Sequence, residues 1–356
     1  MTTRRWLLVV VSFAAAIGVS VYLVLTSWPS DGTPVVLPLA AHALALVAVL
    51  AEIATRALKI QLSARAIRVP LRFTTAVRVC LGGDFGAAIT PARSGAEPAR
   101  FFVLSQAGVA PVSTLLILFA ELFLEMLSLA VIAIVLAIVF SGEGAVIGGL
   151  VGLVGGYAGF VIGAAVFGML LARRNANGPP PRVIRAVGLN AGHWRTVQRA
   201  LRQLRTGVTG LRDASLPLMS GALTFSIMHV LLRLTILPVI VLWLVPGTMT
   251  ASDLSQLVLW PLALLYGGAV APAPGGGGLI EVAFKAALGG AIPAAGFATA
   301  LVWWRFYTFY LYILLGALAA GGTVLRALRP DTEPDAVAGA GTPFATGRRA
   351  RAGRRP

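Results

Sequence analysis

Long apolar runs that carry almost no charge recur along this chain, and they restrict its fold more than any other feature does. A helix needs about 20 mostly apolar residues to cross the hydrocarbon core of a bilayer. Six runs approach or exceed that length: residues 6–26, 35–56, 112–140, 145–171, 216–245 and 294–325. Charged residues make up only 12% of the 356 residues, whereas soluble domains typically carry about 25%. The sequence therefore predicts an all-α polytopic membrane protein with about six full spans.

Basic residues lie in short blocks between the apolar runs, and these blocks predict the orientation of the chain. The net charge is +16, which by itself would also fit nucleic-acid binding. Cytoplasmic loops of membrane proteins, however, are enriched in Lys and Arg, and the blocks follow that pattern. We therefore exclude nucleic acid as a partner. We expect a multi-pass protein of the bacterial cell (inner) membrane with both termini in the cytoplasm.

The chain divides into a membrane domain and a tail. Residues 1–325 are expected to form an integral membrane domain that includes a basic cytoplasmic loop at residues 173–213. Residues 173–212 hold nine arginines and no acidic residue, and apolar residues recur in steps of three and four between Trp194 and Leu211. This pattern predicts either an amphipathic helix on the anionic leaflet or a solvated basic helix. Residues 326–356 hold seven arginines and are expected to be a disordered cytoplasmic tail.

Two further apolar segments are interrupted by proline and glycine: residues 73–106 and residues 254–291. Each interruption is followed by a glutamate and then by a cation, Glu97 and Arg100 in the first segment and Glu281 and Lys285 in the second. Counting the spans places the first segment on the cytoplasmic side and the second on the outer side. Two re-entrant helical hairpins in an inverted repeat explain this pattern. For the first segment, a cytoplasmic loop between two interfacial helices is the alternative.

Ionisable residues within the predicted spans are candidates for a functional site: Glu121, Glu125, His229, Arg233 and Arg305. Each such group costs about 2.5–3.5 kcal/mol at the centre of a bilayer on the insertion scale. We therefore expect these side chains to face one another, or water, inside the protein. Glu52 and Arg56 lie near the end of their run, and we interpret them as an interfacial pair.

A run of glycines at residues 275–278 precedes a helix predicted from Leu279. Gly276, Gly277 and Gly278 would let the backbone approach a ligand closely. The free N–H groups of the helix N-terminus would then suit a phosphate or a carboxylate. A simple flexible bend is the alternative. A phosphate-binding P-loop is excluded because the Lys and Ser/Thr that must follow the glycines are missing.

Nothing in the sequence favours an enzyme. The three histidines are scattered without the spacing of metal ligands, and the chain has no nucleophile elbow. Cys80 is the single cysteine, so no intramolecular disulfide can form. We expect no catalytic activity, no metal and no cofactor.

The interrupted segments resemble those of a known family. Residues 90–100, which read TPARSGAEPAR, are similar to its Pro-x-Arg-x-Gly…Glu…Arg element. Residues 272–281, which read PAPGGGGLIE, are similar to its Pro-x-Pro-Gly-Gly-x-Gly…Glu element. Glu121 and Glu125 stand where the family often has Glu-Arg-x-x-Asp, although Leu122 replaces the arginine. The family is the lysylphosphatidylglycerol synthase transmembrane-region, or flippase-like, family.

The resemblance implies a transporter that moves a phospholipid or another polar-headgroup lipid between leaflets, without an aminoacyl-transfer domain. The residues expected to bind the lipid are Arg93, Glu97, Arg100, Glu121, Glu125, Arg233, Gly276, Gly277, Gly278, Glu281 and Arg305. The expected partners are membrane lipids with an anionic or polar headgroup. Two alternatives stay open: a non-catalytic membrane partner of a lipid-modifying or glycosyl-transferring enzyme, and a small-solute secondary transporter. A homo-oligomer also stays open.

Overall fold

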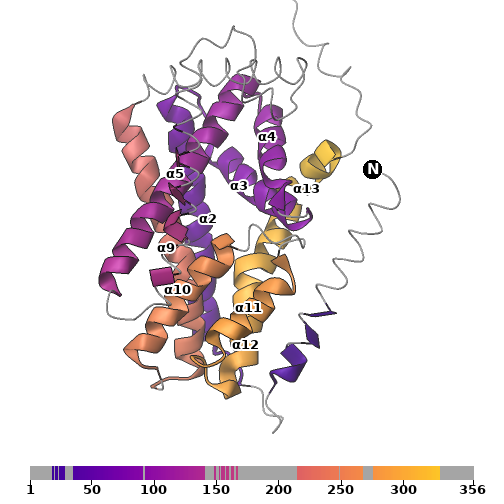
Figure 1. The fold of residues 1–356 in the computed structure, drawn as a ribbon. Helices are drawn as coiled ribbons and strands as arrows, with labels where there is room; N and C mark the ends of the chain where they lie inside the picture. Colours follow the sequence, from indigo (N-terminus) through magenta and orange to yellow (C-terminus); the bar gives the residue numbers. More distant parts are fainter. Residues whose placement is uncertain are drawn as a thin grey trace, which may run out of the picture.

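The computed structural model is helical throughout the part of the chain that it describes (Figure 1). That part comprises residues 35–90, 93–140, 215–247, 249–267 and 276–328, with shorter stretches between 18 and 28 and between 148 and 166. The predicted all-α class is confirmed for these residues. Four predicted features lie wholly or largely outside them: the spans at 6–26 and 145–171, the basic loop at 173–213 and the tail at 326–356.

Among the described residues, three helices are long and apolar enough to cross a membrane: α5 (Pro111–Val139), α9 (Leu216–Leu244) and a continuous helix over Ala294–Leu325. They begin and end within about one residue of the predicted runs. Proline lies in the first turn of α5 and of α9, where its missing N–H costs no helical hydrogen bond. Large apolar side chains are exposed on these helices, as a lipid-facing surface requires; Leu318, for example, is 85% exposed. At these three predicted positions the structure therefore confirms helices of the length and composition that a membrane span needs.

The last of these helices contains a π-turn. Its parts are α12 (Ala294–Arg305), η4 (Phe306–Tyr310) and α13 (Leu311–Leu328). A π-turn inserts an extra residue into the helical register. Arg305 lies before it and bonds to Glu281, and Tyr312 lies after it and bonds to Glu52.

Helix α2 (Leu39–Ala66) corrects one prediction. We expected this span to end at Arg56 and a cytoplasmic stretch to follow, but the helix continues for ten more residues and packs along the length of α9 (Figure 1). Lys59 and Ser63, in that extension, are fully buried. The helix can continue through charged residues because side chains from other helices pair with them. The charges along the sequence do not show which residues of other helices will be those partners.

Both interrupted segments fold as helix pairs. The first is α3 (Phe73–Ala88) with α4 (Ala96–Gln106), and the second is α10 (Ala251–Gly267) with α11 (Leu279–Leu288). The pairs lie towards opposite ends of the molecule in Figure 1. Gly86 and Gly95 let α3 and α4 meet closely, since a side chain on either glycine would collide with the carbonyl oxygen of the other.

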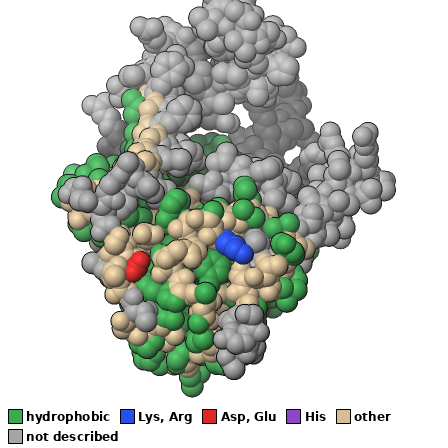
Figure 2. Space-filling model, turned by 60° about the horizontal axis from the view of Figure 1, so that its bottom comes forward, with side chains coloured by type: hydrophobic (Ala, Val, Ile, Leu, Met, Phe, Trp, Pro, Cys, Tyr) green, Lys and Arg blue, Asp and Glu red, His purple; other side chains and the backbone are tan. Residues whose placement is uncertain are grey.

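Apolar packing surrounds a polar centre. One apolar cluster joins α2 and α9 to α11 and α12, and another joins α2 to α3, α4 and α13. Figure 2 shows the end of the molecule that lies at the bottom of Figure 1; among the residues described there, charged side chains are sparse. Many charged side chains of the described chain are instead buried between the helices, chiefly along one face of α2.

Candidate functional site

A buried polar face runs along α2. Glu52, Arg56, Lys59 and Ser63 follow one another at steps of four, three and four residues, so they share one side of the helix. None of them is more than 4% exposed. An unpaired charge in such a place would be strongly destabilising. The surrounding helices must therefore supply partners of the opposite sign.

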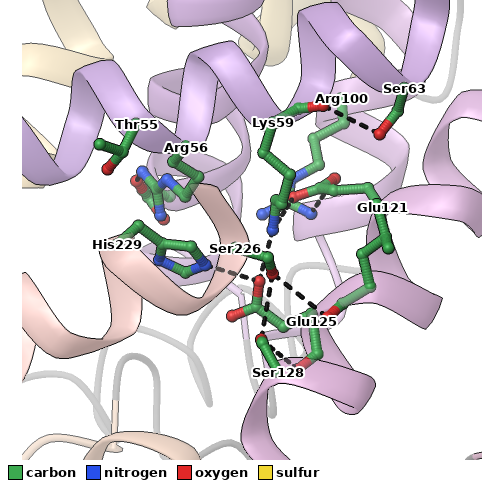
Figure 3. Close-up of polar contacts among 12 residues, drawn as sticks. Thr55, Arg56, Lys59, Ser63, Arg100, Glu121, Glu125, Ser128, Ser226 and His229 are labelled. Atoms are coloured by element: carbon green, nitrogen blue, oxygen red, sulfur yellow. Dashed lines mark hydrogen bonds and ion pairs between the residues drawn. The ribbon is translucent and has the colours of Figure 1, made fainter. Parts of the chain in front are cut away.

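Helix α5 supplies the partners of Lys59. The Lys59 ammonium lies 2.5 Å from Glu125 Oε2 and 3.5 Å from Glu121 Oε1 (Figure 3). Glu121 also accepts a hydrogen bond of 2.8 Å from Arg100 Nη1 of α4, which lies 3.1 Å from Glu97. Glu97 is half exposed, whereas Glu121 is buried. The chain of ion pairs thus leads from the interior at Lys59 outward to Glu97.

Helix α3 supplies the partner of Arg56. Both terminal nitrogens of its guanidinium bond to the carboxylate of Asp84, which is 8% exposed. Paired bonds of this kind are among the strongest that an arginine makes. Arg56 also lies 3.7 Å from Glu52 on its own helix.

Helices α9 and α13 complete the surroundings of Glu52. Its Oε1 lies 3.7 Å from Arg233 Nη1 and 3.7 Å from His229 Nδ1, and its Oε2 accepts a 2.8 Å hydrogen bond from the Tyr312 hydroxyl. His229 Nε2 lies 2.9 Å from Glu125 Oε2. Arg233 donates to the carbonyl of Thr308 at 2.9 Å. Six helices of the described chain, α2, α3, α4, α5, α9 and α13, thus meet at one polar network.

The network encloses a cavity of about 310 Å³. The ionisable residues that line it are Arg56, Arg93, Glu97, Arg100, Glu121, Glu125, His229, Arg233 and Tyr266. A smaller hollow of about 20 Å³ is lined by Asp84, Arg93, Arg233 and Tyr312, among others. Arg93 and Arg233 line both spaces. The site is therefore a charged pocket in which two arginines line both the main cavity and the hollow beside it.

Arg93 differs from the other cationic residues of the pocket in two ways. Its φ of 55° is left-handed, a conformation that costs a non-glycine residue about 1–2 kcal/mol. Among the described residues, no carboxylate lies within ion-pair distance of its guanidinium. Backbone strain of this kind tends to persist where function requires it. The strained turn thus presents to the cavity a cation that forms no ion pair within the described part of the chain.

Six of the predicted lipid-binding residues line this one cavity: Arg93, Glu97, Arg100, Glu121, Glu125 and Arg233. The other predicted residues lie elsewhere. Glu281 and Arg305 form a buried ion pair of 2.8 Å between α11 and α12. Gly276, Gly277 and Gly278 form the turn before α11, where Gly276 and Gly278 have φ values of 68° and 78°. Neither set is part of the cavity wall.

The interpretation of Glu52 and Arg56 as an interfacial pair is wrong. They are 0% and 4% exposed and lie in the interior network, because α2 continues beyond them. Lys59, Asp84 and Tyr312 also belong to the network, although they are not among the predicted lipid-binding residues. The spacing of charges at one face of α2 could have identified Lys59, and an aspartate inside an apolar segment could have identified Asp84. Helical spacing places Tyr312 near the face of Arg305 and Thr308, but it does not show that Tyr312 pairs with Glu52.

A metal centre is not evident in the described part of the chain, where no three His, Cys, Asp or Glu side chains form a group that could hold an ion. The polar pocket suits an organic ligand with charge of either sign. Arginine guanidinium groups match phosphate and carboxylate oxygens, and carboxylates match ammonium groups.

The fold and the site together define a class of protein: a helical, multi-pass membrane protein with a charged pocket between its helices. Within that class, the chain belongs to the family described as the lysylphosphatidylglycerol synthase TM region, whose sequence model matches residues 5–316. The resemblance noted from the two interrupted segments is therefore confirmed. The family places the chain among membrane proteins related to lipid modification or flipping. A search of curated proteins found no match.

Proposed function

We propose that this protein is a flippase-like transporter that moves a phospholipid, or another lipid with a polar headgroup, between the leaflets of the bacterial inner membrane. The observation that carries the proposal is the pocket of about 310 Å³ lined by charged residues of both signs in a multi-pass membrane protein. Ligand pockets in proteins typically have volumes of about 300–1,000 Å³, and this one lies at the lower end of that range. A lipid headgroup would occupy the pocket while its acyl chains stay in the hydrocarbon.

Arg93 and Arg233 are the proposed contacts for the headgroup phosphate. Both line the main cavity and the smaller hollow beside it, and Arg93 has no carboxylate partner among the described residues. Glu97 and Glu125, on the same wall, would bind an amino-bearing headgroup. Arg100 and Glu121 bond to each other at 2.8 Å, and this pair would hold α4 against α5. Both signs of charge are thus available to a zwitterionic or anionic lipid.

Transport is favoured over catalysis by the composition of the cavity wall. The described residues that line it include His229 as a potential base but no serine, threonine or cysteine as a nucleophile beside it. The cationic and anionic side chains are bonded chiefly to one another. We therefore propose that the protein binds and moves its lipid without altering it.

The two helix pairs are proposed to be re-entrant hairpins that enter from opposite sides of the membrane in an inverted repeat. An ion pair of similar placement in each half supports this. In the first half, Arg100 of the hairpin pairs with Glu121 of the next long helix, and in the second half Glu281 pairs with Arg305 in the same way. The two pairs have opposite polarity. Each fixes the second helix of a hairpin to the long helix that follows.

Cysteine accessibility tests the proposed hairpins. Ser94→Cys and Gly277→Cys would be made in a Cys80→Ala background, because the buried Cys80 lies in an apolar cluster. Ser94 is exposed, whereas a side chain at the neighbouring Gly95 would collide with Gly86 and Thr90. We expect a membrane-impermeant maleimide to label Ser94→Cys from the cytoplasmic side and Gly277→Cys from the outer side. Labelling of both from the same side would contradict the inverted arrangement.

A reconstitution assay tests the transport itself. The purified chain would be placed in phosphatidylcholine vesicles that contain traces of an acyl-labelled phospholipid, and an impermeant quencher would report the label in the outer leaflet. We expect label from the inner leaflet to become accessible in vesicles with protein and to stay protected in protein-free vesicles. The assay would be repeated with anionic, zwitterionic and cationic headgroups. A failure to move any of the three would contradict the proposed function.

A further inference from the structure

The geometry around His229 points to a coupling site for protons: we propose that His229, held between Glu52 and Glu125, binds one proton together with each anionic headgroup, so that the two cross the membrane as a neutral pair. This inference rests on the proposed lipid transport and names the ion that drives it. The observations that carry it are the two carboxylates at the imidazole ring and the balance of charge in the network.

Both ring nitrogens of His229 face a carboxylate oxygen. Nε2 lies 2.9 Å from Glu125 Oε2, and Nδ1 lies 3.7 Å from Glu52 Oε1. A neutral imidazole carries a proton on one nitrogen and a lone pair on the other. Each neutral tautomer therefore directs a lone pair at a carboxylate. A second proton on the ring, or one on either carboxyl group, removes that repulsion.

The hydrogen bonding of His229 is incomplete on the side of the ring that faces Glu52. His229 Nδ1 and Glu52 Oε1 are buried atoms without a hydrogen-bond partner in the described structure. The side chains of the two residues are 1% and 0% exposed. A buried polar atom left unpaired costs about 1–3 kcal/mol. A proton on Nδ1 would satisfy both atoms once the ring and the carboxylate approach by at least about 0.5 Å.

The elements packed around His229 bring further ionisable groups to it. Helix α2 contributes Arg56 and Lys59 besides Glu52, α5 contributes Glu121 besides Glu125, and α9 itself contributes Arg233. Helices α10, α13 and α3 add Tyr266, Tyr312 and Asp84. The described residues of α12 and η4 do not line the cavity, and Arg305 of α12 pairs with Glu281.

The charges of this network balance when His229 is neutral and the cavity holds no ligand. Among the described residues the cations are Arg56, Lys59, Arg93, Arg100 and Arg233. The carboxylates are Glu52, Asp84, Glu97, Glu121 and Glu125, also five in number. A phosphate at Arg93 would add one negative charge, and a proton at His229 would cancel it. Since uncompensated charge is costly inside a membrane, the proton and the anion favour each other's binding.

The cavity itself offers the proton a route. His229 and Glu125 both line it, and the Glu125 side chain is 19% exposed. Glu52 lies behind His229, fully buried. A proton and a headgroup that enter this cavity would both come from the side of the membrane to which the cavity is open, as coupled transport requires.

A pH gradient across reconstituted vesicles tests the inference. Phosphatidylcholine vesicles would carry the full chain and traces of acyl-labelled phosphatidylglycerol, with the membrane potential clamped by potassium and valinomycin. Coupling to one proton should let a gradient of one pH unit shift the leaflet ratio of the label about tenfold, towards the alkaline side. Because the pair is neutral, changing the clamped potential should leave this ratio unchanged.

Two histidine variants identify the site. His229→Gln should lose the gradient-driven accumulation, so that its leaflet ratio returns to about one. His42→Gln is the matched control, because His42 bonds to Tyr307 at 2.9 Å and lies outside the cavity wall; it should keep the accumulation. Accumulation that persists in correctly folded His229→Gln protein would overturn the role of His229. If His229→Gln does not fold, as shown by gel filtration, the wild-type gradient measurement still decides whether protons are coupled.

The remaining outcomes separate this inference from the function beneath it. Label that equilibrates between the leaflets but ignores the pH gradient would overturn proton coupling and leave lipid transport standing. Label that follows the potential rather than the pH gradient would overturn the neutral pair. Label that does not move at all, with any of the three headgroup classes, would contradict the proposed transport and remove this inference with it.

Discussion

Replacing Lys59 with methionine is expected to lower the free energy of unfolding by about 3–5 kcal/mol, the usual cost of removing one partner from a buried ion pair. The Lys59 side chain is 0% exposed and its ammonium lies 2.5 Å from Glu125 and 3.5 Å from Glu121. Methionine preserves most of the apolar stem but removes the charge. The buried Glu121 and the partly buried Glu125 would then share only Arg100 and His229 as cationic partners among the described residues. Thermal and denaturant unfolding of the purified protein in detergent measure the loss.

The chain offers its own control for this substitution. Lys285, its other lysine, is exposed on α11, and Lys285→Met should change stability by no more than about 0.5 kcal/mol. Adding Glu125→Gln to Lys59→Met should restore part of the lost stability, because one unpaired carboxylate is then neutral. If Lys59→Met unfolded at the same temperature as Lys285→Met, the network would not be holding the helices together.

The long spans were predictable because the information for them is local. Apolar side chains without interruption define α5, α9 and the helix over Ala294–Leu325, whatever the rest of the chain does. The grouping of Glu121 with Glu125, and of His229 with Arg233, also follows from helical spacing alone. These features can be predicted from residues that lie within one or two helical turns of each other.

The centre of the site could not be read in this way, since its pairs join residues far apart in the chain. Arg56 lies next to Asp84 of α3, and Lys59 lies next to Glu125 of α5. Without those partners, a helix end with Arg56 and Lys59 is typical of a cytoplasmic boundary, which is why α2 was expected to stop at Arg56. The composition of a segment shows what burying its charges would cost, but only the fold shows what offsets that cost.

Arg93→Gly is expected to reduce transport of an anionic phospholipid about tenfold or more while the protein stays as stable as the wild type. A hydrogen bond to a charged group contributes about 1.5–3 kcal/mol, and 1.4 kcal/mol corresponds to a factor of ten in binding. Stability should hold because no described carboxylate depends on Arg93, and because glycine adopts its φ of 55° without strain. The reconstitution assay with labelled phosphatidylglycerol, run beside thermal unfolding, measures both effects.

Arg68→Gly is the matched control, since Arg68 is also a left-handed arginine, with a φ of 63°, but it is exposed and lies outside the cavity wall. Glycine relieves the same backbone strain at both positions, so both variants should unfold at or slightly above the wild-type temperature. Only Arg93→Gly removes a guanidinium from the pocket, and only it should lose transport. Equal transport by the two variants would show that the headgroup does not depend on Arg93. An equal loss in both would assign the defect to the backbone rather than to the charge.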